Sequence, residues 1–184
     1  MSKLNLGCGA RKKAGFLNLD ISDEFSPDII CDLEKGVPFK DDSIDEIRAS
    51  HVLEHLRDTI FVMNEIWRVC KNNAIVHIEV PHQASMMAFA DPTHQRVFNE
   101  ESFKYFCYNG EHYWIHKSYG IKCNFLLVKQ RTSRNRRFGY VMVELKALKG
   151  PKPARVPELP RNTRTRQFSN LLKTGTIFQL ARSF

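Results

Sequence analysis

The stretch that decides the fold is Leu4-Asn5-Leu6-Gly7-Cys8-Gly9, closely followed by Leu17-Asn18-Leu19-Asp20. The first apolar run breaks into two glycines, and the second ends on a carboxylate. Glycine has no Cβ and accepts a positive φ, so a buried strand that enters a glycine turn lets backbone approach a ligand closely. An acid at the tip of the next strand is placed to accept hydrogen bonds from a ribose diol. The two segments together predict a site for a nucleoside cofactor.

The size and composition are those of one globular domain. The chain has 184 residues, of which 42% are hydrophobic and 26% charged. No apolar run approaches the roughly 18 residues that span a bilayer, and no signal-peptide pattern opens the chain, so we expect a cytoplasmic protein. The five cysteines are scattered and form no Cys-x-x-Cys pair, which argues against a disulfide framework and a thiolate zinc site.

The net charge of +8 is concentrated at one end. Residues 129–184 contain 14 Lys/Arg and two acids, so the rest of the chain is mildly acidic. We expect a domain over residues 1–150 and a basic, proline-rich linker with an amphipathic segment over residues 151–184. A basic tail suggests phosphate, nucleic acid or an anionic membrane as a neighbour, and a solvated surface is the equally weighted alternative.

Short apolar runs alternate with helical patterns, which predicts an α/β fold with a mostly parallel, doubly wound, Rossmann-like sheet. A helix is expected after a cap at Asp58, with Asn72-Asn73 as the turn into the next strand, and a second helix is expected from about Asn99 to Tyr108. The last two strands are close enough for an antiparallel hairpin. Expected strands cover residues 3–6, 16–19, 28–31, 46–49, 74–80, 122–129 and 139–148.

The connections between the first strands are unusually short. Only residues 10–16 separate the first two, whereas a parallel crossover normally needs ten or more residues and usually a helix. The helices that should cover one sheet face are therefore reduced. We expect the C-terminal segment or a second subunit to cover that face, which makes a homodimer plausible.

The motifs exclude two common nucleotide sites. Gly7-Cys8-Gly9-Ala10-Arg11-Lys12 lacks the third glycine of a dinucleotide fingerprint, and no Gly-Lys-Ser/Thr follows as in a P-loop. The order and spacing of several segments between residues 3 and 107 instead resemble the class I S-adenosylmethionine-dependent methyltransferases, in particular the compact type 11 branch. The matching segments are residues 4–9, Gly15 to Asp20, Asp32-Leu33, Val37-Pro38-Phe39, Asp45-Glu46-Ile47, residues 50–56, Asp91-Pro92-Thr93-His94 and Glu101-Ser102-Phe103.

The resemblance implies S-adenosyl-L-methionine as the cofactor and a role for each matching residue. Gly7 and Gly9 would contact its methionine portion, with Asn5 and Cys8 alongside. Asp20 would bind the ribose hydroxyls. Asp32 and Leu33 would hold the adenine, and Ser50 and His51 would face the sulfonium. The crevice of such sheets lies beyond the carboxyl ends of the strands.

A competing motif is His51-Val52-Leu53-Glu54-His55, which spells the His-x-x-Glu-His signature of some metallopeptidases. Residues four apart share a face of a helix, so a zinc site is geometrically possible. Spacing indicates no downstream ligand, and the methyltransferase context explains the same residues without metal. We therefore expect no metal ion.

Candidate catalytic residues follow the fifth expected strand. His82, His94 and Asp91 are each placed to serve as a general base toward an acceptor hydroxyl, and the alternative is a loop tied down by its own hydrogen bonds. Methyl transfer needs such a base only if the acceptor must lose a proton.

Three functions remain open on the sequence. The first is a methyltransferase of a small molecule or glycan, acting on oxygen or nitrogen. The second is a nucleic-acid methyltransferase that uses the basic segment 129–184 for phosphate contacts. The third is a non-catalytic subunit or a module docked on a membrane surface.

Overall fold

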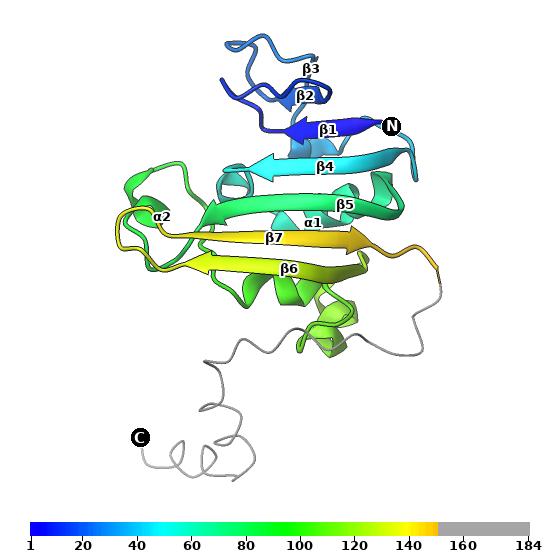
Figure 1. The fold of residues 1–184 in the computed structure, drawn as a ribbon. Helices are drawn as coiled ribbons and strands as arrows, with labels where there is room; N and C mark the ends of the chain where they lie inside the picture. Colours follow the sequence, from blue (N-terminus) through cyan, green and yellow to red (C-terminus); the bar gives the residue numbers. More distant parts are fainter. Residues whose placement is uncertain (151–184) are drawn as a thin grey trace.

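The computed structural model describes residues 1–150, and their backbone forms one mixed seven-stranded sheet with the order β3-β2-β1-β4-β5-β7-β6 (Figure 1). The strands β1 to β5 are mutually parallel, and β7 pairs antiparallel with both β5 and β6. The expected Rossmann-like sheet with an antiparallel hairpin is confirmed. The strands are β1 (Lys3–Leu6), β2 (Leu17–Asp20), β3 (Ile29–Ile30), β4 (Ile44–Ser50), β5 (Cys70–Pro81), β6 (Phe125–Ser133) and β7 (Tyr140–Ala147).

The helix α1 (Thr59–Val69) begins as expected at Asp58, whose side chain accepts a hydrogen bond from the Phe61 amide at 2.8 Å. Its buried face holds Val62, Met63 and Ile66, which belong to the hydrophobic core, and Figure 1 shows α1 behind the sheet. A short α2 (Met87–Ala90) follows β5. The other helical turns are of the 3-10 type: η1 (Leu33–Lys35), η2 (Leu53–His55), η3 (Ser102–Phe106) and η4 (Tyr113–Tyr119).

The expected α-helix from Asn99 to Tyr108 is wrong. Only the 3-10 turn η3 forms there, because the chain is drawn into the sheet at its end: Cys107 bridges to Phe125, and the Tyr108 amide donates to the Phe125 carbonyl at 2.7 Å. The expected turn at Asn72-Asn73 lies inside the bounds of β5. Asn73 has a φ of +67°, and the β4–β5 register shifts there as a bulge.

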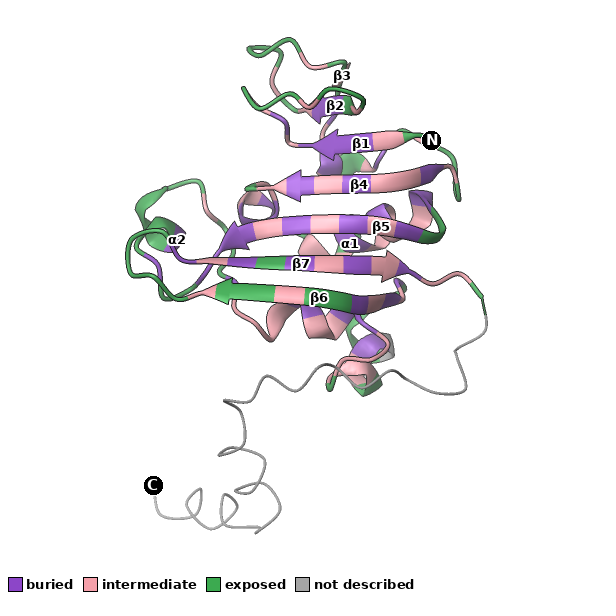
Figure 2. Ribbon diagram, in the orientation of Figure 1, coloured by how far each residue is buried: buried purple, intermediate pink, exposed green. Residues whose placement is uncertain are grey.

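No helix connects β1 to β2 or β2 to β3, so the helices between the first strands are reduced as expected. In the described part of the chain, the sheet face turned to the viewer in Figure 1 carries no helix. That face is polar: Lys3 pairs with Glu46 at 2.7 Å, and His77 lies 3.8 Å from both Glu46 and Glu144. The half-exposed bands along β4, β5 and β7 in Figure 2 follow this alternation. The proposed cover, residues 151–184, lies outside the described residues.

No helix within residues 1–150 has the length and apolar character needed to cross a membrane.

Candidate functional site

The first five strands end at one edge of the sheet, because they are parallel. The strand order reverses between β1 and β4, which are neighbours although β2 and β3 intervene in sequence. Open α/β sheets bind ligands in the crevice at such a switch point. The loops that follow Leu6, Asp20, Ile30, Ser50 and Pro81 therefore meet at this edge.

The turn after β1 takes the conformation that its glycines permit. Gly7 has a φ of +59° and Gly9 a φ of +44°. A Cβ on Gly7 would meet Cγ2 of Val52 at 2.3 Å, whereas a Cβ on Gly9 would have no atom within 4 Å. Gly7 is thus required by close packing against the loop after β4, and Gly9 borders open space.

Asp20 closes this turn. The Gly9 amide donates to its Oδ2 at 2.7 Å and the Ser22 amide donates to its Oδ1 at 3.0 Å. Each oxygen keeps a lone pair for a further donor. Cys8 lies between the glycines with 4% of its surface exposed, and burial raises the pKa of its thiol.

Asn5 is buried, and its amide points into the protein. Its Nδ2 donates to the Arg11 carbonyl at 3.1 Å and to Oδ1 of Asn18 at 2.9 Å. These bonds brace the loop between β1 and β2, which has no helix to hold it. Sequence reasoning missed Asn18 as the second half of this brace.

Asp32 follows β3 and caps η1. Its Oδ1 accepts from the Glu34 amide at 3.0 Å, and its Oδ2 lies 3.2 Å from Nζ of Lys35. Leu33, the first residue of η1, is 6% exposed. The cap fixes an acid and an apolar side chain beside each other at the edge of the sheet.

His51 follows β4 with a φ of +57°, a left-handed backbone conformation uncommon for a residue with a Cβ. Its amide donates to the Glu79 carbonyl at 2.9 Å, and its Nδ1 lies 3.1 Å from Oε1 of Glu54. The hydrogen bond to Glu54, with the negative charges of Glu54 and Glu79, raises the pKa of His51. The preceding Ser50 is the last residue of β4 and is half-buried. Neither glutamate was singled out on the sequence for the cofactor crevice.

His82, just after β5, has both ring nitrogens in hydrogen bonds. Nδ1 accepts from the Ala84 amide at 3.0 Å, and Nε2 lies 3.0 Å from Oε2 of Glu100. The ring is 2% exposed. Burial, and then the positive charge of Arg134, lowers the pKa of His82. Both ring nitrogens of His82 thus have partners within the protein, and its catalytic role stays a prediction.

Asp91 and His94 lie in the loop after α2. Oδ1 of Asp91 accepts from the hydroxyl of Thr93 at 2.6 Å and from its amide at 2.8 Å, and these bonds lower the pKa of the carboxyl. Nδ1 of His94 lies 3.1 Å from the Ala88 carbonyl, and its ring meets that of His55 edge-on at a centroid distance of 4.7 Å. The structure thus joins His94 to the segment after β4, a pairing that no spacing signal on the sequence indicated.

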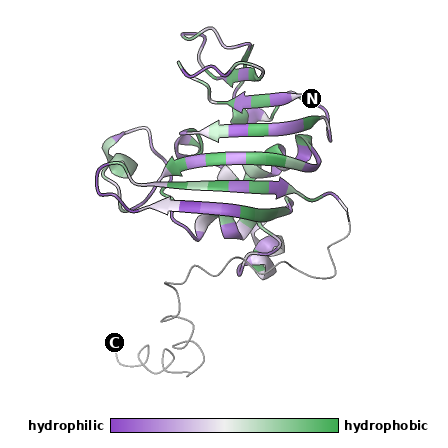
Figure 3. Ribbon diagram, viewed as in Figure 1, coloured by the Kyte–Doolittle hydropathy of each residue, from purple (hydrophilic) through white to green (hydrophobic). Residues whose placement is uncertain are grey.

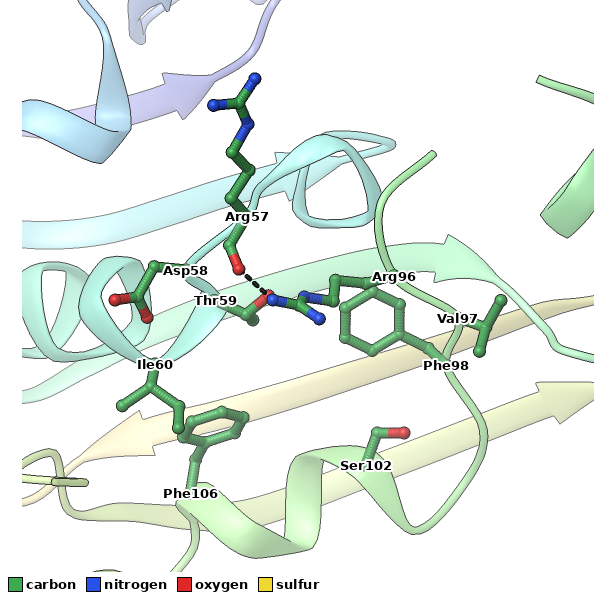
Figure 4. A pocket seen from close by; sticks show the side chains of 9 residues that line it. All are labelled: Arg57, Asp58, Thr59, Ile60, Arg96, Val97, Phe98, Ser102 and Phe106. Atoms are coloured by element: carbon green, nitrogen blue, oxygen red, sulfur yellow. Dashed lines mark hydrogen bonds between the residues drawn. The ribbon is translucent and has the colours of Figure 1, made fainter. Parts of the chain in front are cut away.

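Two cavities lie beside this loop. One of about 380 Å³ lies at the start of α1, where Phe98 and Phe106 form apolar walls and the Arg96 guanidinium donates to the Arg57 carbonyl (Figure 4). The other, of about 400 Å³, is lined by Asp91, His94 and Arg96 among others. None of the expected cofactor-binding residues lines either cavity.

The comparisons with known proteins agree with this geometry. Residues 4–78 match a family model described as "Methyltransferase domain". A search of curated proteins gave no match. Similar solved structures include a SAM-dependent methyltransferase from Archaeoglobus fulgidus, 18% identical, with a TM-score of 0.54 over 79% of this chain and 85% of that one.

Two further structural neighbours are described as catalysing different reactions from each other, a methyl transfer and a cyclisation. A Burkholderia thailandensis 1,6-didemethyltoxoflavin-N1-methyltransferase, with bound 1,6-didemethyltoxoflavin and S-adenosylhomocysteine, is 10% identical, with a TM-score of 0.54 over 80% of this chain and 71% of that one. The [4+2]-cyclase SpnF is 15% identical, with a TM-score of 0.56 over 81% of this chain and 75% of that one. At these identities the structural likeness shows the fold, and the resemblance noted on the sequence is confirmed by the family match and the fold together.

Proposed function

We propose that this chain, whose residues 4–78 match a methyltransferase domain, binds S-adenosyl-L-methionine and transfers its methyl group to a small-molecule or glycan acceptor. The observation that carries the proposal is the turn after β1. Its backbone is bent by two glycines at positive φ and tied to Asp20 through the Gly9 amide, while the space outside Gly9 is open. A methionine chain laid along that open side would reach backbone without meeting a Cβ.

The residues on the neighbouring strands would bind the rest of the cofactor. Asp20 keeps lone pairs for the ribose hydroxyls, and its place at the tip of β2 fits that role. Asp32 and the buried Leu33 would hold the adenine amino group and ring. Ser50 and His51 would lie near the sulfonium, where the glutamates that contact His51 add negative charge. Cys8 would pack beside the methionine portion, and Asn5 would act through the loop that it braces.

Catalysis would rest mainly on holding the acceptor atom in line with the methyl carbon and sulfur. Of the three residues expected to assist, His94 has a ring nitrogen, Nε2, that makes no hydrogen bond within residues 1–150. Its Nε2 is 3.9 Å from Oδ2 of Asp91, and its ring lines the 400 Å³ cavity, which is large enough for a small acceptor. The toxoflavin methyltransferase, a neighbour of the same fold, is described with a small molecule bound, which is in line with a small acceptor for this chain.

A nucleic-acid acceptor is the second candidate, and the exposed end of the hairpin favours it. Lys129 and Arg131 on β6 are exposed, as are Arg136 and Arg137 in the loop to β7. Figure 3 shows the hydrophilic end of β6, which borders that loop. Exposed cations of this kind bind phosphates without reading sequence.

Calorimetric titration of the full chain with S-adenosylhomocysteine tests the proposal. We expect saturable binding, and a loss of roughly 100-fold in affinity in Asp20→Ala, because a carboxylate that holds both the turn and the ribose is removed. Asp23→Ala is the matched control, since Asp23 is an exposed acid three residues further on. Binding that is absent in the wild type, or equal in the two variants, would contradict the proposed site.

Cofactor binding alone does not distinguish an enzyme from a protein that binds the cofactor but transfers no methyl group. Release of S-adenosylhomocysteine, measured with panels of small hydroxylated and amino compounds, glycans and RNA, makes that distinction. Turnover with RNA alone would favour the second candidate.

A further inference from the structure

Glu54 is a buried acid that the proposed cofactor site leaves incompletely satisfied. It lies in η2, and its side chain is 1% exposed. Oε1 contacts Nδ1 of His51 at 3.1 Å, but Oε2 has no hydrogen-bond partner among the residues that the structure describes. Buried carboxylate oxygens are normally paired, so this oxygen indicates a missing partner.

Two histidines stand next to this carboxylate. One ring nitrogen of His55, one of His94 and one carboxylate oxygen of Glu54 all lie within 4.8 Å of one another. The loop that carries His94 is held in place by main-chain bonds: the amides of Gln95 and Arg96 donate to the Glu54 carbonyl at 2.7 and 3.0 Å. Main-chain hydrogen bonds therefore hold the two segments that carry these side chains next to each other.

The hydrogen bonds of the two rings determine which nitrogens are available. Nδ1 of His94 faces the Ala88 carbonyl at 3.1 Å, and a carbonyl only accepts, so this nitrogen carries the proton. Nδ1 of His55 faces Oγ1 of Thr93 at 2.9 Å, and the Thr93 hydroxyl already donates to Asp91. Nδ1 of His55 is then the donor as well. In both neutral rings the lone pair is on Nε2.

We propose that Glu54, His55 and His94 bind a divalent transition-metal ion of the zinc type. Two imidazoles and one carboxylate are the donor set of zinc sites that keep a fourth position open. Each ring is oriented through its other nitrogen by a carbonyl or by the Thr93–Asp91 pair, as metal-bound histidines usually are. The carboxylates of Glu54 and Asp91 match the charge of a divalent cation.

The site differs from the metallopeptidase motif in the sequence. His51 is outside the cluster, because it precedes the short turn η2; of the three cluster residues, Glu54 is the one to which its ring is hydrogen-bonded. The third ligand is His94 from the loop after α2, which the motif does not contain. The earlier expectation of no metal rested on the lack of a downstream ligand, and the fold supplies one.

The place of the site suggests a use for the ion. The cluster follows β4 directly after Ser50 and His51, and His94 also lines the 400 Å³ cavity. An acceptor oxygen would fill the open fourth position, an assignment that rests on the proposed function. His94 would then be a metal ligand and would not act as a base.

The direct test is calorimetric titration of the full, tag-free chain with ZnSO₄ after treatment with a chelator. We expect one equivalent to bind, and a loss of roughly 100-fold in affinity in His94→Ala and in His55→Ala, each of which removes one ligand. His77→Asn is the matched control, because it removes a histidine of β5 that is outside the cluster and lies between Glu46 and Glu144. If His94→Ala or His55→Ala does not unfold cooperatively, His94→Gln or His55→Gln is used in its place.

Cobalt(II) gives a second readout, since its visible absorption reports ligand number and geometry. The proposal is overturned if the wild type binds no zinc, or if the ligand variants bind it as tightly as His77→Asn. Titration of the same proteins with S-adenosylhomocysteine separates this inference from the proposed function. If the protein binds zinc but not S-adenosylhomocysteine, the metal site is supported and the proposed methyltransferase function is contradicted. If it binds S-adenosylhomocysteine but not zinc, the proposed function is supported and the metal site is contradicted.

Discussion

Gly7 and Gly9 share a positive φ, but their surroundings give them different roles. Gly7 lies against Val52, so its missing side chain makes room for protein. Gly9 faces open space, so its missing side chain leaves room for the proposed cofactor. A positive φ alone destabilises a residue with a Cβ by about 1–2 kcal/mol, which applies to both positions. At Gly7 a Cβ would in addition clash with Val52. At Gly9 it would in addition take up space that the proposed cofactor needs.

The pair Gly7→Ala and Gly9→Ala therefore separates folding from binding. We expect Gly7→Ala to lower the free energy of unfolding by about 3 kcal/mol or more, because strain and overpacking combine. Gly9→Ala should lower it by only about 1–2 kcal/mol and should weaken S-adenosylhomocysteine binding by roughly 100-fold. Denaturant unfolding and calorimetry measure the two effects. Equal losses of stability in both variants would contradict the assignment.

His82 gives the protein a pH-dependent contribution to stability. In the fold its pKa is lowered by burial and by Arg134, whereas an unfolded histidine titrates at about 6.5. Below that value the unfolded chain binds the proton more readily, so protonation favours unfolding. The wild type should lose stability from His82 as the pH falls through about 6.5 and toward the lowered pKa.

His82→Gln tests this sign. Glutamine can offer one acceptor and one donor, as the neutral ring does toward Ala84 and Glu100, but it does not titrate. We expect the stability difference between wild type and variant to shrink or reverse between about pH 7.5 and pH 5. Urea unfolding at each pH measures it. A difference that is constant across this range would show that His82 is not held neutral.

At the scale of elements, the strands and α1 follow from local pattern. The apolar spacing of Val62, Met63 and Ile66 behind an Asp58 cap specifies α1 without tertiary information. The turn η3 shows the limit of such reasoning. A cap-like Asn99 and an apolar run were present, but pairing of Cys107 and Tyr108 with the Phe125 region overrode them.

The candidate site also has one part that local sequence predicts and another that depends on tertiary contacts. The glycine turn, Asp20 and Asp32 are predictable because each lies within a few residues of the strand end that presents it. The contact between Glu54, His55 and His94 depends on how the loop after α2 folds back onto η2. No periodicity in the sequence encodes that approach, so it emerges only from the assembled molecule.

At the scale of the whole molecule, the helices of residues 1–150 cover one face of the sheet and leave the other, half-exposed face without a helix (Figures 1 and 2). The missing helices are those between β1, β2 and β3. Buried and half-exposed side chains alternate along these strands. On the face without helices, Glu46, Arg48 and His77 form a half-exposed polar network where a covered sheet would carry apolar side chains. A polar face of this kind is stable in water without the cover expected from a tail or second subunit.

The boundary proposed at residue 150 is consistent with the core of the described residues, 1–150, whose last member along the chain is Ala147 on β7. A chain shortened to residues 1–150 should unfold within about 3 °C of the full chain and bind S-adenosylhomocysteine equally well, since it keeps every core residue of the described part of the chain. If the basic segment binds nucleic acid, the full chain should slow the migration of RNA in a gel at low salt. The shortened chain should slow it less, because it retains only part of the positive charge, including Lys129, Arg131, Arg136 and Arg137. Thermal unfolding, calorimetry and gel mobility at two salt concentrations measure these outcomes. A large fall in the unfolding temperature would contradict the boundary, and equal or absent retardation would assign the charge of residues 151–184 to something other than RNA.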